Sequence, residues 1–421
     1  MNPENTLLAQ NSSRRHDLDW LRVIAFGLLI LYHVGMFYVT WDWHVKSPHA
    51  SRFLEPAMVL VNPWRLALLF FISGVALRFA LDKARYGTQN GTQRKNGIAA
   101  FARARFVRLF LPIAFGMLVL VVPQSYFELL TKGEIEPGYW RFYPAYLDLE
   151  QHFSIITPTW NHLWYVVYLL IYTLLIVAVS PWLGRLAAGR GERLFAWLLR
   201  GPTGLRLFVV PALPFIAYRF VLAPHFPTTH ALVDDWANHA NNLTVLLLGY
   251  LAAKSPFFWQ AIAAARVRAL TTTLAFAALL TVAYLNAGWV RQNDVLITAF
   301  HTLRTLYAWL AILTLLGLAQ RWLDRPGPLL AYLSGAIFPC YILHQTLIVV
   351  IGYALAGMRL PVAAEAGIVT GGTVAGCLVL YETIRRVGPL RPLFGLPWRK
   401  PEHSSGQAAA PVRPRRRVTS T

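Results

Sequence analysis

The chain has 421 residues, of which 56% are hydrophobic and only 14% are charged. Because about a quarter of the residues of an ordinary soluble protein are charged, this composition argues against a soluble globular enzyme and indicates an integral membrane protein. The net charge of +20 would suggest nucleic-acid binding in a soluble domain, but here Lys and Arg concentrate in particular loops, as they do in membrane proteins. The two cysteines, Cys340 and Cys377, lie in apolar runs and indicate no disulfide framework.

Long apolar runs predict an all-α, polytopic membrane protein with about ten transmembrane helices. The predicted spans are residues 20–40, 60–81, 105–123, 162–181, 207–223, 241–255, 269–286, 295–318, 329–353 and 362–382. The sixth is the shortest, and its apolar core needs flanking residues to cross a bilayer. No internal repeat stands out, so we expect a single membrane domain over 17–390. It lies between a cytoplasmic tail (1–16) and a basic, disordered cytoplasmic tail (391–421).

The loops between these spans alternate in their content of Lys and Arg. The loops after the second, fourth, sixth and eighth spans are rich in basic residues, whereas the odd-numbered loops are poor in them. The fifth loop, residues 224–240, contains neither Lys nor Arg. Since basic loops stay on the cytoplasmic side, we expect both termini in the cytoplasm and the odd-numbered loops outside.

The first span carries a titratable group at its centre. It begins with Asp17-Leu-Asp19-Trp-Leu-Arg22 and continues as an apolar run that is interrupted by His33. Arg22 and His33 are eleven residues apart, close to three helical turns, so they share a face and are separated by roughly 16 Å along the axis. A His at mid-bilayer is costly and usually functional. The alternative is a structural His that is hydrogen-bonded to a neighbouring helix.

Further charged and polar residues lie at the two ends of the predicted bundle. Arg105 and Arg108, three residues apart at the cytoplasmic mouth of the third span, share a helix face and could fork phosphate oxygens, or could be ordinary flanking charge. Aromatic rings beside carboxylates and imidazoles suit sugars. An aromatic belt would explain the Trp residues of the outer side but not its Asp, His and Glu. These candidate acceptor-binding residues are Asp42, Trp43, His44, Arg65, Glu128, His162 and Trp164. His344, at mid-depth in the ninth span, either lines the same cavity or only packs.

Two of these patterns are similar to motifs of a known family. Arg22, ten intervening residues and His33 resemble the first-helix motif of membrane acyltransferase family 3. The stretch Arg105-Phe-Val-Arg108 resembles the Arg-x-x-Arg motif of its third helix. The predicted number of ten spans also agrees with that family. Over residues 14–385 the amino-acid sequence is similar to that of the branch of the family that modifies periplasmic glucans.

The resemblance implies an O-acyltransferase of the bacterial inner membrane. Its donor would be acyl-CoA or a similar thioester bound from the cytosol, with its phosphates held by Arg105, Arg108 and Arg22. The catalytic His33 would act as general base on an acceptor hydroxyl or would carry a covalent acyl group. The acceptor would be a periplasmic glucan or another cell-envelope glycan. If the acyl group is succinyl, with succinyl-CoA as donor, Arg65 is a candidate partner for its free carboxylate.

Asp17 or Asp19 is expected to pair with Arg22 rather than to orient the imidazole three turns away. We expect no metal site, no permanently bound cofactor and no nucleic-acid partner. The rival function is a transporter or channel with an intramembrane His and Arg pathway, because buried ionisable residues also occur in proton relays and substrate routes. Transporters often contain inverted repeats, which we do not find in this sequence.

Overall fold

The computed structural model describes residues 15–398 except 87, 90–91, 94–96 and 200–204. The regular secondary structure of the described residues is helical apart from one antiparallel pair of two-residue strands, β1 (Thr88–Gln89) and β2 (Thr92–Gln93). The all-α prediction is therefore confirmed in kind. Of the two predicted tails, residues 1–14 and 399–421 lie outside the described residues.

The helices follow one another along the chain with few long connections. The elements before the middle of the chain are α2 (His16–Tyr38), η1 (Arg52–Leu54), α3 (Glu55–Tyr86), α4 (Gly97–Phe115), η2 (Gly116–Leu120), α5 (Val122–Lys132), α6 (Tyr139–Leu147), η3 (Asn161–Leu163), α7 (Trp164–Leu186), η4 (Ala187–Gly191) and α8 (Glu192–Leu199). The later ones are α9 (Leu205–Val209), η5 (Val210–Ala212), α10 (Leu213–Val221), α11 (Trp236–Ala252), α12 (Pro256–Leu285), α13 (Ala287–Val290), α14 (Asp294–Trp322), α15 (Pro328–Ala356), α16 (Val362–Arg386) and α17 (Leu390–Leu393).

Eight helical segments among the described residues are long and apolar enough to cross a membrane. They correspond to every predicted span except the fifth and the sixth. The predicted span 207–223 is broken into α9, η5 and α10, where Pro211 and Pro214 each remove a backbone donor and interrupt a regular helix. The predicted span 241–255 corresponds to α11, which has only 17 residues. The count of ten and the cytoplasmic termini therefore stay predictions.

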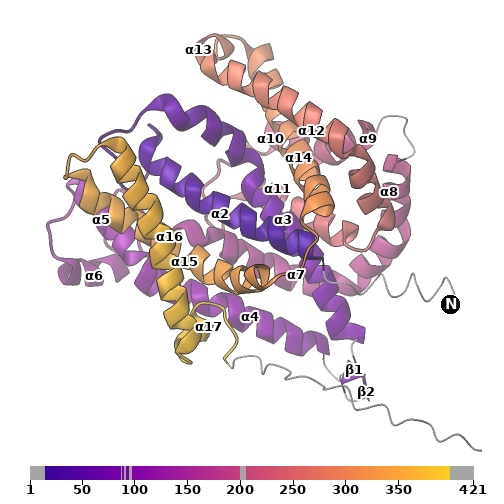
Figure 1. Cartoon of the computed structure of the whole chain (residues 1–421), viewed down its shortest axis with the longest axis horizontal. Coiled ribbons are helices and arrows are strands. Elements are labelled where there is room, and N and C mark those ends of the chain that lie inside the picture. Colours follow the sequence, from indigo (N-terminus) through magenta and orange to yellow (C-terminus); the bar gives the residue numbers. More distant parts are fainter. Residues whose placement is uncertain (1–14, 87, 90–91, 94–96, 200–204, 399–421) are drawn as a thin grey trace, which may run out of the picture.

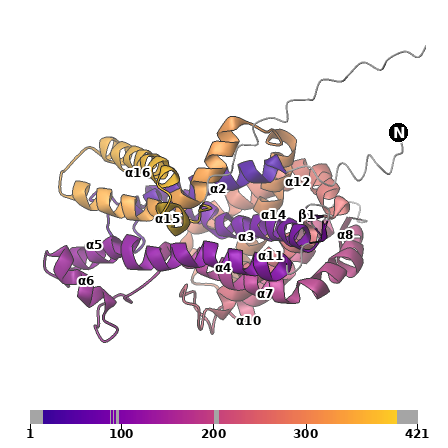
Figure 2. The same cartoon turned by 90° about the horizontal axis from the view of Figure 1, so that it is seen from below.

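Helices α2 and α3 occupy the middle of the bundle in both Figure 1 and Figure 2. Helix α3 packs against α11, α2 packs against α15 and α14, and α4 packs against α7. The long pair α12 and α14, joined at α13, forms one side, while α15 and α16 form the other side together with α5. Because α2 is central, its His33 meets side chains from several other helices.

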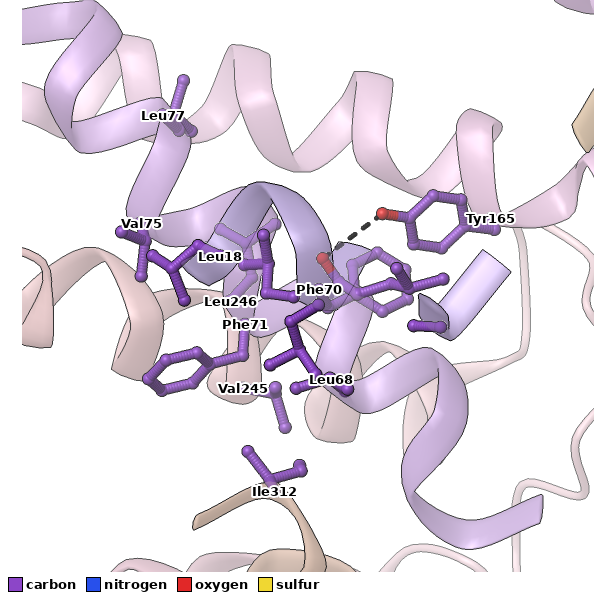
Figure 3. Packing of buried hydrophobic residues seen from close by; sticks show 14 of the residues in the cluster. Leu18, Leu68, Phe70, Phe71, Val75, Leu77, Tyr165, Val245, Leu246 and Ile312 are labelled. Carbon is purple, nitrogen blue, oxygen red and sulfur yellow. Dashed lines mark hydrogen bonds between the residues drawn. The ribbon is translucent and has the colours of Figure 1, made fainter. Parts of the chain in front are cut away.

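Two glycines let α3 and α11 approach backbone to backbone. A Cβ added at Gly74 would lie 2.0 Å from the Leu246 carbonyl oxygen, and one at Gly249 would lie 2.1 Å from the Phe71 carbonyl oxygen. Around this contact, the buried side chains of α3 interlock with those of α11, as Figure 3 shows for Phe71 beside Leu246. Close packing of this kind is how helices associate in membranes, and it fixes the position of α3 in the bundle.

The chain after α16 turns back onto the end of α4. Arg391 is buried and donates to the carbonyl oxygens of Pro397 and Arg385, at 2.7 and 2.6 Å. Arg108 donates from Nε to the Gly395 carbonyl oxygen at 2.9 Å. The packed chain therefore extends several residues past the domain boundary predicted at 390.

Candidate active site

His33 lies against a second histidine from a distant helix. Its Nδ1 is 2.7 Å from Nε2 of His344, which is fully buried on α15. Nδ1 of His344 lies 2.6 Å from the Tyr341 carbonyl oxygen and must donate to it, because a carbonyl only accepts. In a neutral His344, Nε2 is then the acceptor, so Nδ1 of His33 is the donor. This relay leaves the lone pair of His33 on Nε2, the nitrogen that can take a proton from a substrate.

A large cavity gives access to His33. It has a volume of about 970 Å³ and is lined by residues of three predicted outer loops as well as by α2, α3, α7, α10, α11, α14 and α15. His33 is part of its wall, whereas His344 is not. The ring is therefore hydrogen-bonded to a neighbouring helix, as the structural alternative expects, and it also borders the cavity; its catalytic role stays a prediction. His344 supports this ring from behind.

Most of the predicted acceptor-binding residues share this cavity. Asp42, Trp43, His44, Arg65, His162 and Trp164 are among the residues that line it. Trp164 stacks on His230, with the ring centroids 4.3 Å apart. Burial lowers the pKa of His230, so this ring is neutral at pH 7. Glu128 does not line the cavity, but it hydrogen-bonds to His44, which does.

A polar network behind the cavity orients His44. Nδ1 of His44 contacts the Glu128 carboxylate in a very short hydrogen bond. The Gln345 amide donates to Nε2 of His44 at 2.8 Å, so Nδ1 carries the proton that Glu128 accepts. Lys132 forms an ion pair with the other Glu128 oxygen at 2.8 Å. Gln345 also donates to Gln124 at 3.1 Å, which ties α5 to α15. The carboxylate therefore positions a cavity-lining imidazole.

The predicted donor-binding arginines gather at the opposite end of α2. Arg22 is close enough to both Arg105 and Arg108 for its charge to act on theirs. The two acidic residues beside it behave differently. Asp19 pairs with Arg22 at 3.3 Å, whereas Asp17 is buried and pairs with Arg15 at 2.6 Å. The prediction that Asp17 or Asp19 pairs with Arg22 is therefore confirmed through Asp19, while Asp17 pairs with Arg15 instead.

A second cavity of about 650 Å³ lies beside these arginines. It is lined by one face of α4, which includes Arg103 and Arg108, and by the returning chain at Pro392 and Trp398. Arg105 is not in its lining, and its guanidinium group lies over the Phe101 ring at 5.3 Å. Of the predicted pair, Arg108 therefore lines this cavity and Arg105 does not.

An aromatic layer separates the arginines from His33. Phe26, one helical turn above Arg22, contacts Tyr165 and Tyr341 edge-on, with ring centroids 6.4 and 5.4 Å away. The Tyr165 hydroxyl points toward α3, where Ser73 lies 3.0 Å away and the Leu69 carbonyl oxygen 3.4 Å away (Figure 3). Among the described residues, none lines both cavities. For a thioester that entered from the arginine side to reach His33, the aromatic side chains of this layer would have to move apart.

Sequence reasoning missed several polar residues of the large cavity, which is called the outer cavity from here on because predicted outer loops border it. Arg219, His230 and Arg304 line it, and so does Asn242 on α11. Arg304 and Arg219 lie within the eighth and fifth predicted spans. Because a charged side chain is energetically costly inside a membrane, both could have been identified from the sequence as candidate functional residues. Gln345 follows His344 directly and had no signal of its own. Within the described ranges, no three His, Cys, Asp or Glu side chains are grouped so that they could hold a metal ion.

The family model described as an acyltransferase domain matches residues 15–382, which include His33 and the arginines Arg22, Arg105 and Arg108. The chain belongs to acyltransferase family 3. It therefore contains an acyltransferase domain, and its apolar helices make it a multi-pass membrane protein. This membership accounts for the His33 and Arg105-x-x-Arg108 motifs, whose individual roles stay predictions.

Curated relatives of this acyltransferase share only part of its length. It is 25% identical over 174 residues to glucans biosynthesis protein C of Salmonella paratyphi B, and equally to the proteins of that name from Salmonella heidelberg and Salmonella schwarzengrund. These matches cover 40% of this chain and 40% of each relative. No solved structure matches the chain.

Proposed function

We propose that the protein is an O-acyltransferase of the bacterial inner membrane. It moves an acyl group, with succinyl the first candidate, from a cytoplasmic acyl-CoA-type donor to a hydroxyl of a periplasmic glucan or another cell-envelope glycan. The acyltransferase family supports the reaction class, and the name of the Salmonella relatives, glucans biosynthesis protein C, supports a glucan as the acceptor. The observation that carries the proposal is the relay from the Tyr341 carbonyl through His344 to His33, which ends at a large cavity.

The relay suggests how the chemistry proceeds. Nε2 of His33 takes the proton of the acceptor hydroxyl while the oxygen attacks the thioester carbonyl carbon. The C–S bond then breaks, and the protonated imidazole returns its proton to the departing sulfur, so the products are the ester and free CoA. The hydrogen bond to His344 keeps the ring in the tautomer that can begin this sequence.

Substrate binding divides between the two ends of the bundle. Arg22, Arg105 and Arg108 would hold the donor phosphates, because guanidinium groups fork phosphate oxygens. The sugar would bind in the outer cavity, where Trp43 offers a flat apolar face, His44 forms part of the wall and Nδ1 of His162 has no hydrogen-bond partner among the described residues. Acyl-CoA is a substrate in this scheme, and no permanently bound cofactor takes part.

The proposal is tested with purified protein in lipid vesicles that are supplied with succinyl-CoA or acetyl-CoA and a glucan. We expect free CoA to be released together with a mass increase of one acyl group on the glucan. His33→Ala should abolish both while the protein still folds in the membrane. Acylation that persists in that variant would remove His33 from the mechanism. Glucan uptake without CoA release would instead favour the transporter alternative.

A further inference from the structure

Three arginines from three different helices line the outer cavity. They are Arg65 on α3, Arg219 on α10 and Arg304 on α14. They lie close enough together for Arg219 and Arg65 to act electrostatically on Arg304. Gathering like charges inside an apolar bundle is costly unless something opposes them. These three positive charges therefore need a negatively charged partner.

No acid balances them within the described part of the chain, where no ion pair includes any of the three. The side chain of Arg65, only 9% exposed, lies over the Tyr32 ring at 3.5 Å and donates to the Asn62 side chain. Its Nε is buried and has no hydrogen-bond partner among the described residues. Arg219 donates to Nε2 of His301 at 2.8 Å. These neutral partners orient the guanidinium groups but do not cancel their charge.

Asp42 is the single carboxylate among the described residues that line the cavity, and it is engaged elsewhere. It is exposed, and its charge acts on Lys46 and Lys132. The cavity therefore keeps an excess of positive charge on the side of Arg65 and Arg304. Arg65 is also near enough to His33 for its charge to act on that ring. The excess charge thus lies within reach of the reacting centre.

We propose that Arg65, Arg219 and Arg304 form a binding site for one anionic group, a carboxylate or a phosphate, that enters the outer cavity on a substrate. The proposal rests on the acyl transfer proposed above and deepens it, because it adds a requirement on substrate charge. Two sources fit this chemistry. One is a free carboxylate at the end of the transferred acyl chain, and the other is a charged substituent on the acceptor glycan. In either case the anion supplies the missing partner of Arg65 and holds its substrate beside His33.

The test compares Arg304→Gln with a matched control, Arg141→Gln. Arg141 lies on α6 outside the cavity, and its side chain is 81% exposed. Vesicles with each protein receive either succinyl-CoA or acetyl-CoA, and either a neutral glucan or a phosphoglycerol-substituted glucan. We expect Arg304→Gln to lose about tenfold or more of its transfer rate only where the anion is present, since charge-assisted hydrogen bonds are the strong ones. Arg141→Gln should match the unmodified protein in every arm.

The pattern of loss separates the sources. A loss confined to succinyl-CoA assigns the anion to the acyl chain, and a loss confined to the charged glucan assigns it to the acceptor. An equal loss in all arms, or no loss in any, overturns the anion site while leaving the acyl transfer intact.

If the unmodified protein transfers no acyl group, the proposed function fails, and binding still tests the site. The unfolding temperature is then measured with sodium succinate or inorganic phosphate against sodium chloride at equal ionic strength. We expect a rise with either polyvalent anion in the unmodified protein and in Arg141→Gln, and a much smaller rise in Arg304→Gln and Arg65→Gln. An equal response from all four proteins overturns the inference. Unfolding temperatures without added anion report whether each variant is folded.

Discussion

The relay behind His33 predicts that two similar substitutions of His344 have different effects. In His344→Gln, the side-chain oxygen can take the place of Nε2 and still accept from His33. In His344→Asn, the amide nitrogen can take the place of Nδ1 and donate to the Tyr341 carbonyl, but nothing replaces Nε2. The two variants therefore separate the two hydrogen bonds, which measure 2.7 and 2.6 Å in the native protein.

The expected loss follows from what His344→Asn leaves unpaired. His344 is fully buried, so no water replaces it and the Nδ1–H of His33 loses its acceptor. An unsatisfied buried donor costs about 1–3 kcal/mol. His33 escapes this cost by rotating or by moving its proton to Nε2, which removes the lone pair that begins the reaction. At 1.36 kcal/mol for each tenfold change, kcat should fall about 5- to 150-fold.

The assay measures kcat and its pH dependence for both variants at saturating donor and acceptor. His344→Gln should stay within about fivefold of the native kcat, because its acceptor supports the same tautomer. A purely structural role for His344 would lower the amount of folded protein without altering the pH profile of the folded fraction. Equal kcat values and equal profiles for the Asn and Gln variants would refute the relay.

Further predictions concern packing and the two ends of the bundle. Gly249→Ala should destabilise the protein by about 1–3 kcal/mol or more, because its Cβ would meet the Phe71 backbone. Gly371→Ala, where a Cβ meets nothing within 4 Å, should leave the unfolding temperature unchanged, and an equal fall in both would contradict the reasoning. Arg108→Gln should raise KM for acyl-CoA roughly tenfold with a smaller effect on kcat, and the opposite split would remove it from donor binding. Glu128→Gln should raise KM for the glucan, because the His44 ring loses the charge that holds its tautomer; an unchanged acceptor KM would show that this network serves only stability.

Local properties of the sequence were enough to predict part of this protein. Hydrophobic runs of bilayer length predict the all-α class, because a chain in lipid must satisfy its own backbone hydrogen bonds. Helical periodicity places Arg22 and His33 on one face of α2, and the same rule pairs Asp19 with Arg22 one turn apart. The fifth span, 207–223, was predicted as one continuous helix, and the structure replaces it with α9, η5 and α10.

Only the tertiary structure decided which distant side chains meet. His33 and His344 are 311 residues apart, and no periodicity relates α2 to α15. Arg65, Arg219 and Arg304 look like isolated charges until α3, α10 and α14 pack around one cavity. The physical reason is that hydrophobicity and helical pitch act over a few residues, whereas these pairs depend on how closely whole helices approach, which glycines such as Gly249 control.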